Sequence, residues 1–451
     1  MHITVLNGSP KGAYSITLQT VRYLAALHPE HTFEEVHVGQ KIRALEKDIA
    51  PAVDAIKRAE LVLFAYPVYT FLAPWQMHRF IELLREQGAD IGGRFASQIT
   101  TSKHFYDITA HRYIEDMCGE LGLRCIRGLS ADMDDLLSEK GQKEARAFFD
   151  YTLFCMKQGI CREPAPAPMI LRHLDVDVPE QTDTEKPGDI AVVTNCAADD
   201  VQLQRMIRRF SAVMPRRVRV VNIGEYPFSG GCLGCFNCAV SGKCIYKDGF
   251  DDYLRRTIQT AEAIVYAFTV KDHSMGASFK LYDDRQFCNG HRTVTMGMPI
   301  GYLISGSYTA ETNLQTLIEA RAQVGGNFLA GIATDECDPN GEIDRLAASL
   351  AYALENRYVP PANFYGIGGM KVFRDLIWLM QGMMRADHKF YKAHGQYDFP
   401  QKKWGTMLKM YAVGALLSSP KIKAKMGNAM NEGMIAPYKK VLDAAANKES
   451  R

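Results

Sequence analysis

The sequence predicts an α/β protein made of two doubly wound parallel sheets in tandem, followed by a helical extension. Short apolar runs alternate with helical patterns through residues 1–162, and the same order recurs through residues 188–357. Strands that alternate with helices are typical of a parallel sheet with helices on both faces. After residue 357 the chain becomes basic and Met-rich, and only helical patterns remain.

The first copy, residues 1–162, contains four apolar runs that predict strands buried on both faces. These strands are expected at residues 3–7, 61–65, 95–101 and 125–130, with helices at 50–59, 75–86, 110–122 and around Leu18 to Leu24. Each predicted helix separates two strands. This arrangement favours one parallel sheet with helices on both of its faces.

The second copy, residues 188–357, repeats the first in order and in sequence. Residues 190–195 echo residues 3–7, and residues 261–268 echo residues 59–66. Between the copies, residues 163–187 are rich in Pro and acidic residues, which predicts a linker. The second copy has a longer interval between its first two matching segments, and a cluster of four cysteines at residues 232–244 lies within it.

Length and composition limit the class of protein. The 451 residues fit two to four domains at roughly 100–200 residues each, and 47% apolar with 23% charged residues is ordinary for a globular chain. We find no apolar run of the roughly 18–20 residues that a membrane span needs and no signal-peptide pattern, so we expect a cytoplasmic protein. In a reducing compartment, clustered cysteines indicate metal or redox chemistry before disulfides.

The loop at residues 7–17, which we name the cradle loop, predicts an anion site. It joins the first strand to the first helix, where backbone N–H groups and the helix N-terminus favour negative charge. Hydroxyl groups, a glycine and a cation add to it: Ser9, Lys11, Gly12, Ser15 and Thr17. A phosphate monoester fits this set, although a well-capped turn that binds nothing has the same pattern.

Loops after the next strands provide the remainder of a ligand site, because ligands of open parallel sheets bind beyond the carboxyl ends of the strands. The loop after residues 61–65 begins Pro67, Val68, Tyr69 and Thr70, and the next loop contains Thr101, Ser102, Lys103 and His104. An aromatic side chain and backbone-rich loops beside a phosphate site suit a flat, heteroaromatic phosphate ester. Tyr69 is either a stacking partner or part of the core.

These motifs resemble those of the flavodoxin-like NADPH-dependent FMN reductases. The resemblance rests on Gly8–Lys11, on Ser15–Thr17 and on Pro67–Tyr69, and it covers about the first 155 residues. It implies FMN, with the phosphate at the cradle loop, and NAD(P)H as the co-substrate that stacks transiently on the flavin. Lys103 and His104 then become candidate catalytic residues that stabilise the reduced ring.

The second copy lacks this chemistry at the corresponding loop. Its residues 194–200 replace the Gly-Ser pair with Cys-Ala, and Asp199 and Asp200 stand at the helix N-terminus. Carboxylates at that position cap the helix themselves and repel a dianion. We therefore expect no FMN phosphate in the second copy.

The four clustered cysteines, Cys232, Cys235, Cys238 and Cys244, have the spacing C-x2-C-x2-C-x5-C. The leading run is the one that ferredoxin-type clusters use, whereas structural zinc sites more often have two separated pairs. A [4Fe–4S] cluster is favoured, and zinc, free thiols or a redox disulfide stay open. The run resembles that of the iron–sulfur flavoproteins, in which the flavin of one subunit approaches the cluster of its neighbour.

This chain departs from that pattern because its FMN motif and its cysteines lie in different copies. We expect an internal pseudo-dimer, and the complete chain could also pair as a homodimer. The predicted function is an FMN-dependent NAD(P)H oxidoreductase that passes electrons through a [4Fe–4S] cluster to a small-molecule or protein acceptor. The alternatives are a non-catalytic electron carrier and a reductase whose cysteine domain is structural.

The extension, residues 358–451, is basic. From Lys371 to Arg451 it has 15 Lys and Arg but 6 Asp and Glu. We favour a helical cap packed across both copies over docking of an acidic partner or contact with an anionic membrane surface. No nucleic-acid motif accompanies the charge, so nucleic-acid binding is not expected.

Overall fold

The computed structural model describes residues 1–104, 106–162, 173–180, 185–399 and 403–418, with residues 435, 438, 439 and 442. The chain forms two compact units, Met1–Ala393 and His394–Arg451. None of the described helices combines the length and the apolar character needed to cross a membrane. Most of the predicted linker lies outside the described residues.

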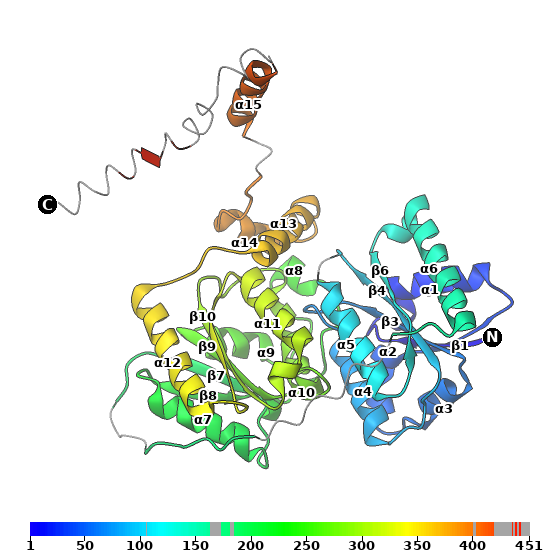
Figure 1. The fold of residues 1–451 in the computed structure, drawn as a ribbon, viewed down its shortest axis with the longest axis horizontal. Helices are drawn as coiled ribbons and strands as arrows, with labels where there is room; N and C mark the ends of the chain where they lie inside the picture. Colours follow the sequence, from blue (N-terminus) through cyan, green and yellow to red (C-terminus); the bar gives the residue numbers. More distant parts are fainter. Residues whose placement is uncertain are drawn as a thin grey trace. The chain divides into compact units, whose positions relative to one another are not determined.

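The first sheet is parallel and doubly wound, as predicted (Figure 1). Its strands are β1 (His2–Asn7), β2 (Thr32–Val36), β3 (Leu61–Pro67), β4 (Phe95–Ser102), β5 (Arg124–Cys125) and β6 (Leu129–Asp132), and the order is β2-β1-β3-β4-β5 with β6 also pairing with β4. The accompanying helices are α1 (Ile16–Leu27), α2 (Val38–Leu45), α3 (Ala50–Arg58), α4 (Trp75–Glu86), α5 (Asp107–Glu120) and α6 (Glu139–Gln158). This strand order is the flavodoxin-like one.

The second sheet has the same topology. It contains β7 (Ile190–Thr194), β8 (Val218–Asn222), β9 (Ala263–Thr269), β10 (Pro299–Ser305) and β11 (Phe328–Thr334), in the order β11-β10-β9-β7-β8. Its helices are α7 (Val201–Val213), α8 (Asn237–Ser241), α9 (Phe250–Tyr253), α10 (Gly276–Arg285), α11 (Thr312–Gly325) and α12 (Pro339–Asn356). The prediction of two tandem flavodoxin-like sheets is therefore confirmed.

Six short helical turns connect these elements: η1 (Gly12–Tyr14), η2 (Asp135–Leu137), η3 (Ile223–Glu225), η4 (Leu254–Ile258), η5 (Gln286–Asn289) and η6 (Tyr308–Ala310). The predicted strand at residues 125–130 is divided into β5 and β6. Gly128 lies in the break, where a Cβ atom would stand 2.3 Å from the Gln98 side chain and 2.6 Å from its carbonyl oxygen. The close approach of the two backbones at this point explains the glycine.

The two copies pack through reciprocal helix contacts. Helix α4 packs against α10, and α5 packs against α11. The Trp75 N–H at the start of α4 donates to Asp284 Oδ2 (2.7 Å), and the Ala277 N–H of α10 donates to Glu82 Oε1 (2.7 Å). Each helix thus receives a carboxylate near its N-terminus from the other copy, where the helix dipole favours negative charge.

The predicted extension is divided between the two compact units. Its first helices, α13 (Phe364–Leu379) and α14 (Arg385–Ala393), belong to the unit that contains both sheets, and they pack against α11 and α8. Asp387 of α14 is fully buried and accepts hydrogen bonds from the His291 N–H (3.1 Å) and from Arg292 Nη1 (2.6 Å). The second unit contains α15 (Trp404–Leu417).

Candidate functional site

One cavity of about 490 Å³ joins the predicted ligand loops of the first copy to the cysteines of the second. It is lined by most of the residues predicted for the phosphate ester and its ring: Ser9, Lys11, Ser15, Thr17, Pro67, Val68, Tyr69, Thr70, Thr101, Ser102 and Lys103. Cys232, Cys235, Cys238 and Cys244 line the same cavity. Two sites that the sequence places far apart therefore share one space.

The cradle loop is held by its own backbone and by Asn7. The Asn7 amide donates from Nδ2 to the Gly12 carbonyl (2.9 Å), and its Oδ1 accepts from the Ser9 N–H (3.1 Å). Gly12 has φ +55°, a left-handed conformation that favours glycine, and Gln40 fills the space beside its Cα. Gly12 therefore shapes the loop without lining the cavity.

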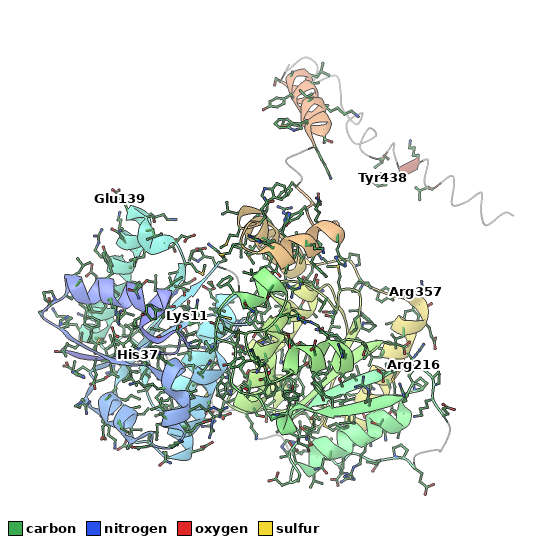
Figure 2. All side chains as sticks on the ribbon, turned by 180° about the vertical axis from the view of Figure 1, so that it is seen from behind. Lys11, His37, Glu139, Arg216, Arg357 and Tyr438 are labelled. Carbon is green, nitrogen blue, oxygen red and sulfur yellow. The ribbon has the colours of Figure 1, made fainter. Side chains whose placement is uncertain are left out.

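Hydroxyl groups gather at the N-terminus of α1. Ser15 is the N-cap, and its Oγ accepts from the Leu18 N–H (3.3 Å). Thr17 Oγ1 lies 2.6 Å from Thr101 Oγ1 at the end of β4. Figure 2 shows Lys11 of this loop on the side of the first copy that faces the second, with His37 farther from that side. Hydroxyls, orphan N–H groups and a lysine together can bind a dianion.

The turn after β3, residues 69–72, has an unusual backbone. Thr70 and Phe71 have φ values of +47° and +69°, and Tyr69 and Leu72 exchange both backbone hydrogen bonds (2.8 and 3.0 Å). Non-glycine residues in this region cost roughly 1–2 kcal/mol each. The turn persists because the second copy binds it from outside.

A buried charge network of the second copy provides that binding. Lys280, which is fully buried, donates from Nζ to the Tyr69 carbonyl (3.0 Å) and to Thr70 Oγ1 (2.6 Å). Arg321 Nη2 donates to the Thr70 carbonyl (2.6 Å). Sequence reasoning missed both cations, because they lie more than 200 residues from the turn and no motif marks them.

Two carboxylates balance these cations. Asp283 accepts from Lys280 (3.0 Å) and from Arg321 (2.8 Å), and Asp284 contacts Lys280. Although burial opposes it, Arg321 lowers the pKa of Asp283, whereas burial raises the pKa of Asp284 to about 6. The network therefore holds one firmly ionised carboxylate between two cations.

The two candidate catalytic residues have different positions. Lys103 lines the cavity, and its Nζ contacts Asp132 Oδ1 at 2.7 Å. Although burial opposes it, this hydrogen bond raises the pKa of Lys103, which keeps the ammonium charged. His104 does not line the cavity. Its ring is half-exposed, with nitrogens 3.3 Å from Ser130 Oγ and 3.3 Å from Asp135 Oδ2.

The cysteine loop, residues 231–244, packs directly on the first copy. Gly234 has φ +60°, and a Cβ atom there would lie 2.1 Å from Tyr69 Oη. Lys11 Nζ lies 5.7 Å from the centre of the Phe236 ring, and Gly231 faces Trp75. Tyr69 therefore stands between the ligand loops and the thiols, and only glycine fits opposite its hydroxyl.

Cys232, Cys238 and Cys244 are partly buried, whereas Cys235 is exposed. The Gly234 N–H donates to Cys232 Sγ (3.4 Å). Burial raises the pKa of the Cys232 thiol well above its usual range and that of Cys238 to about 11. Such thiols lose their protons when they bind a metal, because the cation replaces the lost solvation of the thiolate.

The thiol spacing bears on which metal would fit. In the described chain, no three of these sulfur atoms lie within 4.8 Å of one another. Four thiolates around one zinc ion would stand about 3.8 Å apart, given a tetrahedral site with bonds of about 2.3 Å. The thiols as placed are thus more widely spaced than a zinc site requires.

A buried ion pair anchors the base of the cysteine loop. Arg285 at the end of α10 binds Asp248 through both carboxylate oxygens (2.7 and 2.8 Å) and donates to the Gly230 carbonyl (3.0 Å). Although burial opposes it, the hydrogen bonds from Arg285 lower the pKa of Asp248 to about 2. Helix α10 therefore fixes both the cysteine loop and, through Lys280, the turn of the first copy.

The corresponding edge of the second copy is filled by its own residues. Asp200 caps α7 by accepting from the Leu203 N–H (3.3 Å), and it also accepts a hydrogen bond from Thr269 at the end of β9. Asp335 accepts from the Gly306 N–H (3.0 Å) and lies 2.9 Å from His173 of the predicted linker. Asp200 thus occupies the N-cap position that Ser15 holds in the first copy.

Comparisons with known proteins agree with the sequence resemblance. A family described as having a Flavodoxin-like fold matches residues 1–105. An iron-sulfur flavoprotein from Archaeoglobus fulgidus is 24% identical over 175 residues, which is 36% of this chain and 78% of that protein.

Solved structures with a similar chain path include an NADH:FMN oxidoreductase in its apo form, with 19% identity and a TM-score of 0.30 over 36% of this chain and 91% of that one. An NAD(P)H:quinone oxidoreductase from Methanothermobacter marburgensis has 12% identity and a TM-score of 0.28 over 37% and 99%. The family match and the Archaeoglobus relative support the resemblance predicted from the motifs, and both sheets have the flavodoxin-like fold.

Proposed function

We propose that this protein is an FMN-dependent NAD(P)H oxidoreductase that passes electrons through a [4Fe–4S] cluster to a separate acceptor. The observation that carries the proposal is the shared cavity, which is lined by the cradle loop of one copy and by four thiols of the other. Its volume of about 490 Å³ falls in the range of small-molecule sites. The relative described as an iron-sulfur flavoprotein supports the same pair of cofactors.

The residues present fit FMN. Ser9, Ser15 and Thr17, with the N-terminus of α1, would hold the phosphate. Tyr69 and the backbone of the 69–72 turn would lie against the ring. Lys103 would place a positive charge beside it, which favours an electron-rich ring.

The residues also fit a cluster. Cys232, Cys235, Cys238 and Cys244 would supply its four thiolates, and the Gly234 N–H would stabilise charge on the Cys232 sulfur. When bound, FMN accepts a hydride from the nicotinamide and the cluster carries electrons one at a time. The contact of Tyr69 with the cysteine loop keeps the two sites adjacent, and Phe373 and Leu376 of α13 with the C-cap Met380 line the cavity wall.

The test is anaerobic turnover of NADH or NADPH with a small quinone as acceptor. Wild-type protein should turn over many times per chain, whereas Ser15→Asp and Cys235→Ser should each lose at least 90% of the quinone-dependent rate. A carrier would give a single reduction per chain and no turnover. An unchanged rate in Cys235→Ser would show that the thiols are structural.

A further inference from the structure

We propose that the second compact unit, residues 394–451, binds an anionic lipid bilayer through helix α15. The unit has 10 Lys and Arg but 4 Asp and Glu. Helix α15 contains a single charged residue, Lys409, in the sequence WGTMLKMYAVGALL. An apolar helix inside a basic segment matches the chemistry of a membrane surface that contains acidic lipids.

The apolar side chains of α15 are exposed. Trp404, Leu408 and Tyr411 are 66%, 66% and 73% exposed, and Leu416 is 58% exposed. Transfer of such side chains out of water is favourable in proportion to the apolar surface that is buried. We therefore expect these apolar side chains to be buried against another surface when the protein functions.

The distribution of side chains around α15 favours lipid over a protein groove. Trp404, Leu408, Tyr411 and Ala415 follow one line at helical spacing, and the opposite side carries Val413 between Lys409 and Thr406. Apolar side chains therefore lie on every side of α15. A groove in a partner protein covers one face of a helix, whereas lipid can cover apolar side chains over most of the circumference.

The length and the flanking residues of α15 agree with a helix that lies in the interface. Fourteen residues span about 21 Å, less than the roughly 30 Å of a bilayer core. Trp404 stands at one end, after Lys402 and Lys403, and Lys421, Lys423 and Lys425 follow the helix in the sequence. Each lysine near an anionic surface strengthens the attraction to it.

Binding to lipid would bring the protein to acceptors that dissolve in membranes. Only this consequence rests on the proposed function, because it assumes a reductase whose acceptor is a hydrophobic quinone. The binding step itself depends on α15 and its charge alone. The two can fail separately, since lipid binding is measured without NAD(P)H.

The test is flotation of the full-length protein with phosphatidylcholine vesicles that contain phosphatidylglycerol, compared with pure phosphatidylcholine vesicles. We expect at least tenfold stronger binding to the anionic vesicles at low salt and a clear loss in high salt. Leu408→Asp with Leu416→Asp should lower binding at least tenfold. Leu137→Asp, at an apolar residue 83% exposed in the first copy, is the matched control and should bind as wild type does.

Three outcomes would overturn the proposal. One is the absence of flotation with anionic vesicles, and another is equal binding by the double variant and the wild type. The third is an oligomer that the double variant dissociates, together with no vesicle binding, which would assign α15 to a second copy of the chain. Circular dichroism of each variant shows that the first unit stays folded.

Discussion

The turns after β3 and β9 have the same backbone and different roles. Thr70 and Phe71 of the first copy and Asp272 and His273 of the second all have φ values between +47° and +69°, and both turns close with a pair of backbone hydrogen bonds. The first turn lines the cavity and is bound by buried cations. The second turn is bound by acidic residues of both copies, because His273 contacts Glu120 and Glu311 at 3.0 Å.

The same contrast holds at the first helix of each copy. Ser15 caps α1 and leaves the adjoining N–H groups to a ligand, whereas Asp200 caps α7 and brings its own charge. The first copy thus presents hydroxyl groups at this edge, and the second copy closes the same edge with its own carboxylate. Helix α10 supports both halves of the cavity. Its Lys280 binds the turn of the first copy, and its Arg285 binds the base of the cysteine loop.

The largest expected effect is on the free energy of unfolding, when Lys280, which binds the turn at residues 69–72, is replaced. Lys280→Met leaves Asp283 and Asp284 buried with less compensation, so we expect a loss of about 3–5 kcal/mol in the free energy of unfolding. The matched control is His78→Met, at the corresponding position of α4. His78 is buried, and burial lowers its pKa well below the usual range, so it is neutral.

The His78 nitrogens have no hydrogen-bond partner among the described residues, and its ring stacks on Tyr113 at 3.9 Å. Replacement by Met should cost less than about 1.5 kcal/mol. Denaturant titrations of both variants decide the comparison. Equal losses would mean that the charge network is no more important than ordinary packing.

A substitution that gives the first copy the N-cap residue type of the second copy should weaken FMN binding without weakening the fold. Ser15→Asp keeps an N-cap acceptor, so the free energy of unfolding should change by less than about 1 kcal/mol. At the proposed phosphate site the added carboxylate would repel the FMN phosphate, and we expect flavin affinity to fall at least 100-fold, about 2.7 kcal/mol. Fluorescence titration with FMN measures this, and flavin binding at the wild-type affinity would refute the phosphate site.

The interface histidine should make stability depend on pH. Hydrogen bonds to Glu120 and Glu311 raise the pKa of His273 to about 10, above the value near 6.5 of an unfolded histidine. Its stabilising contribution is therefore complete below about pH 6.5 and is lost as the pH rises toward 10.

His273→Gln tests this dependence. At pH 6.5 the variant should be less stable than wild type by about 2 kcal/mol, and the difference should shrink toward pH 10. Thermal unfolding at half-unit pH intervals measures the difference. A constant difference across this range would show that protonation of His273 contributes nothing.

The smallest expected effect concerns glycine in the cradle loop. Gly12 (φ +55°) and Gly93 (φ +77°) both have left-handed backbones, but a Cβ atom would meet a neighbour within 4 Å at Gly12 alone, where Gln40 stands. Replacement of either by Ala should cost about 1 kcal/mol of stability. Only Gly12→Ala should also weaken FMN binding, and equal FMN affinity in both variants would exclude a role of the loop shape.

Much of the fold was predictable because its strands are local apolar runs. The expected strands at 3–7, 61–65 and 95–101 lie within β1, β3 and β4. Strands β2 and β8 were missed, since they are edge strands with half-exposed, polar or charged side chains such as Glu34 and Arg219. Their pairing depends on the neighbouring strand more than on their own pattern.

The parts of the candidate site that are continuous segments of the sequence could be predicted. The contacts between residues far apart in the sequence could not. The cradle loop and the cysteine run are continuous in sequence, and most of their residues line the cavity. The network of Lys280 and Arg321 on Thr70 joins residues 210 and 251 positions apart. No local pattern reports such a pairing, because it arises only when the two copies pack.

The most direct test of the central claim is the content of flavin, iron and acid-labile sulfide per chain after anaerobic purification. The shared cavity predicts one FMN and about four irons and four sulfides in the wild type. It also predicts that Ser15→Asp loses the flavin but keeps the iron, and that Cys235→Ser loses the iron but keeps the flavin. Flavin without iron and sulfide in the wild type would contradict the account.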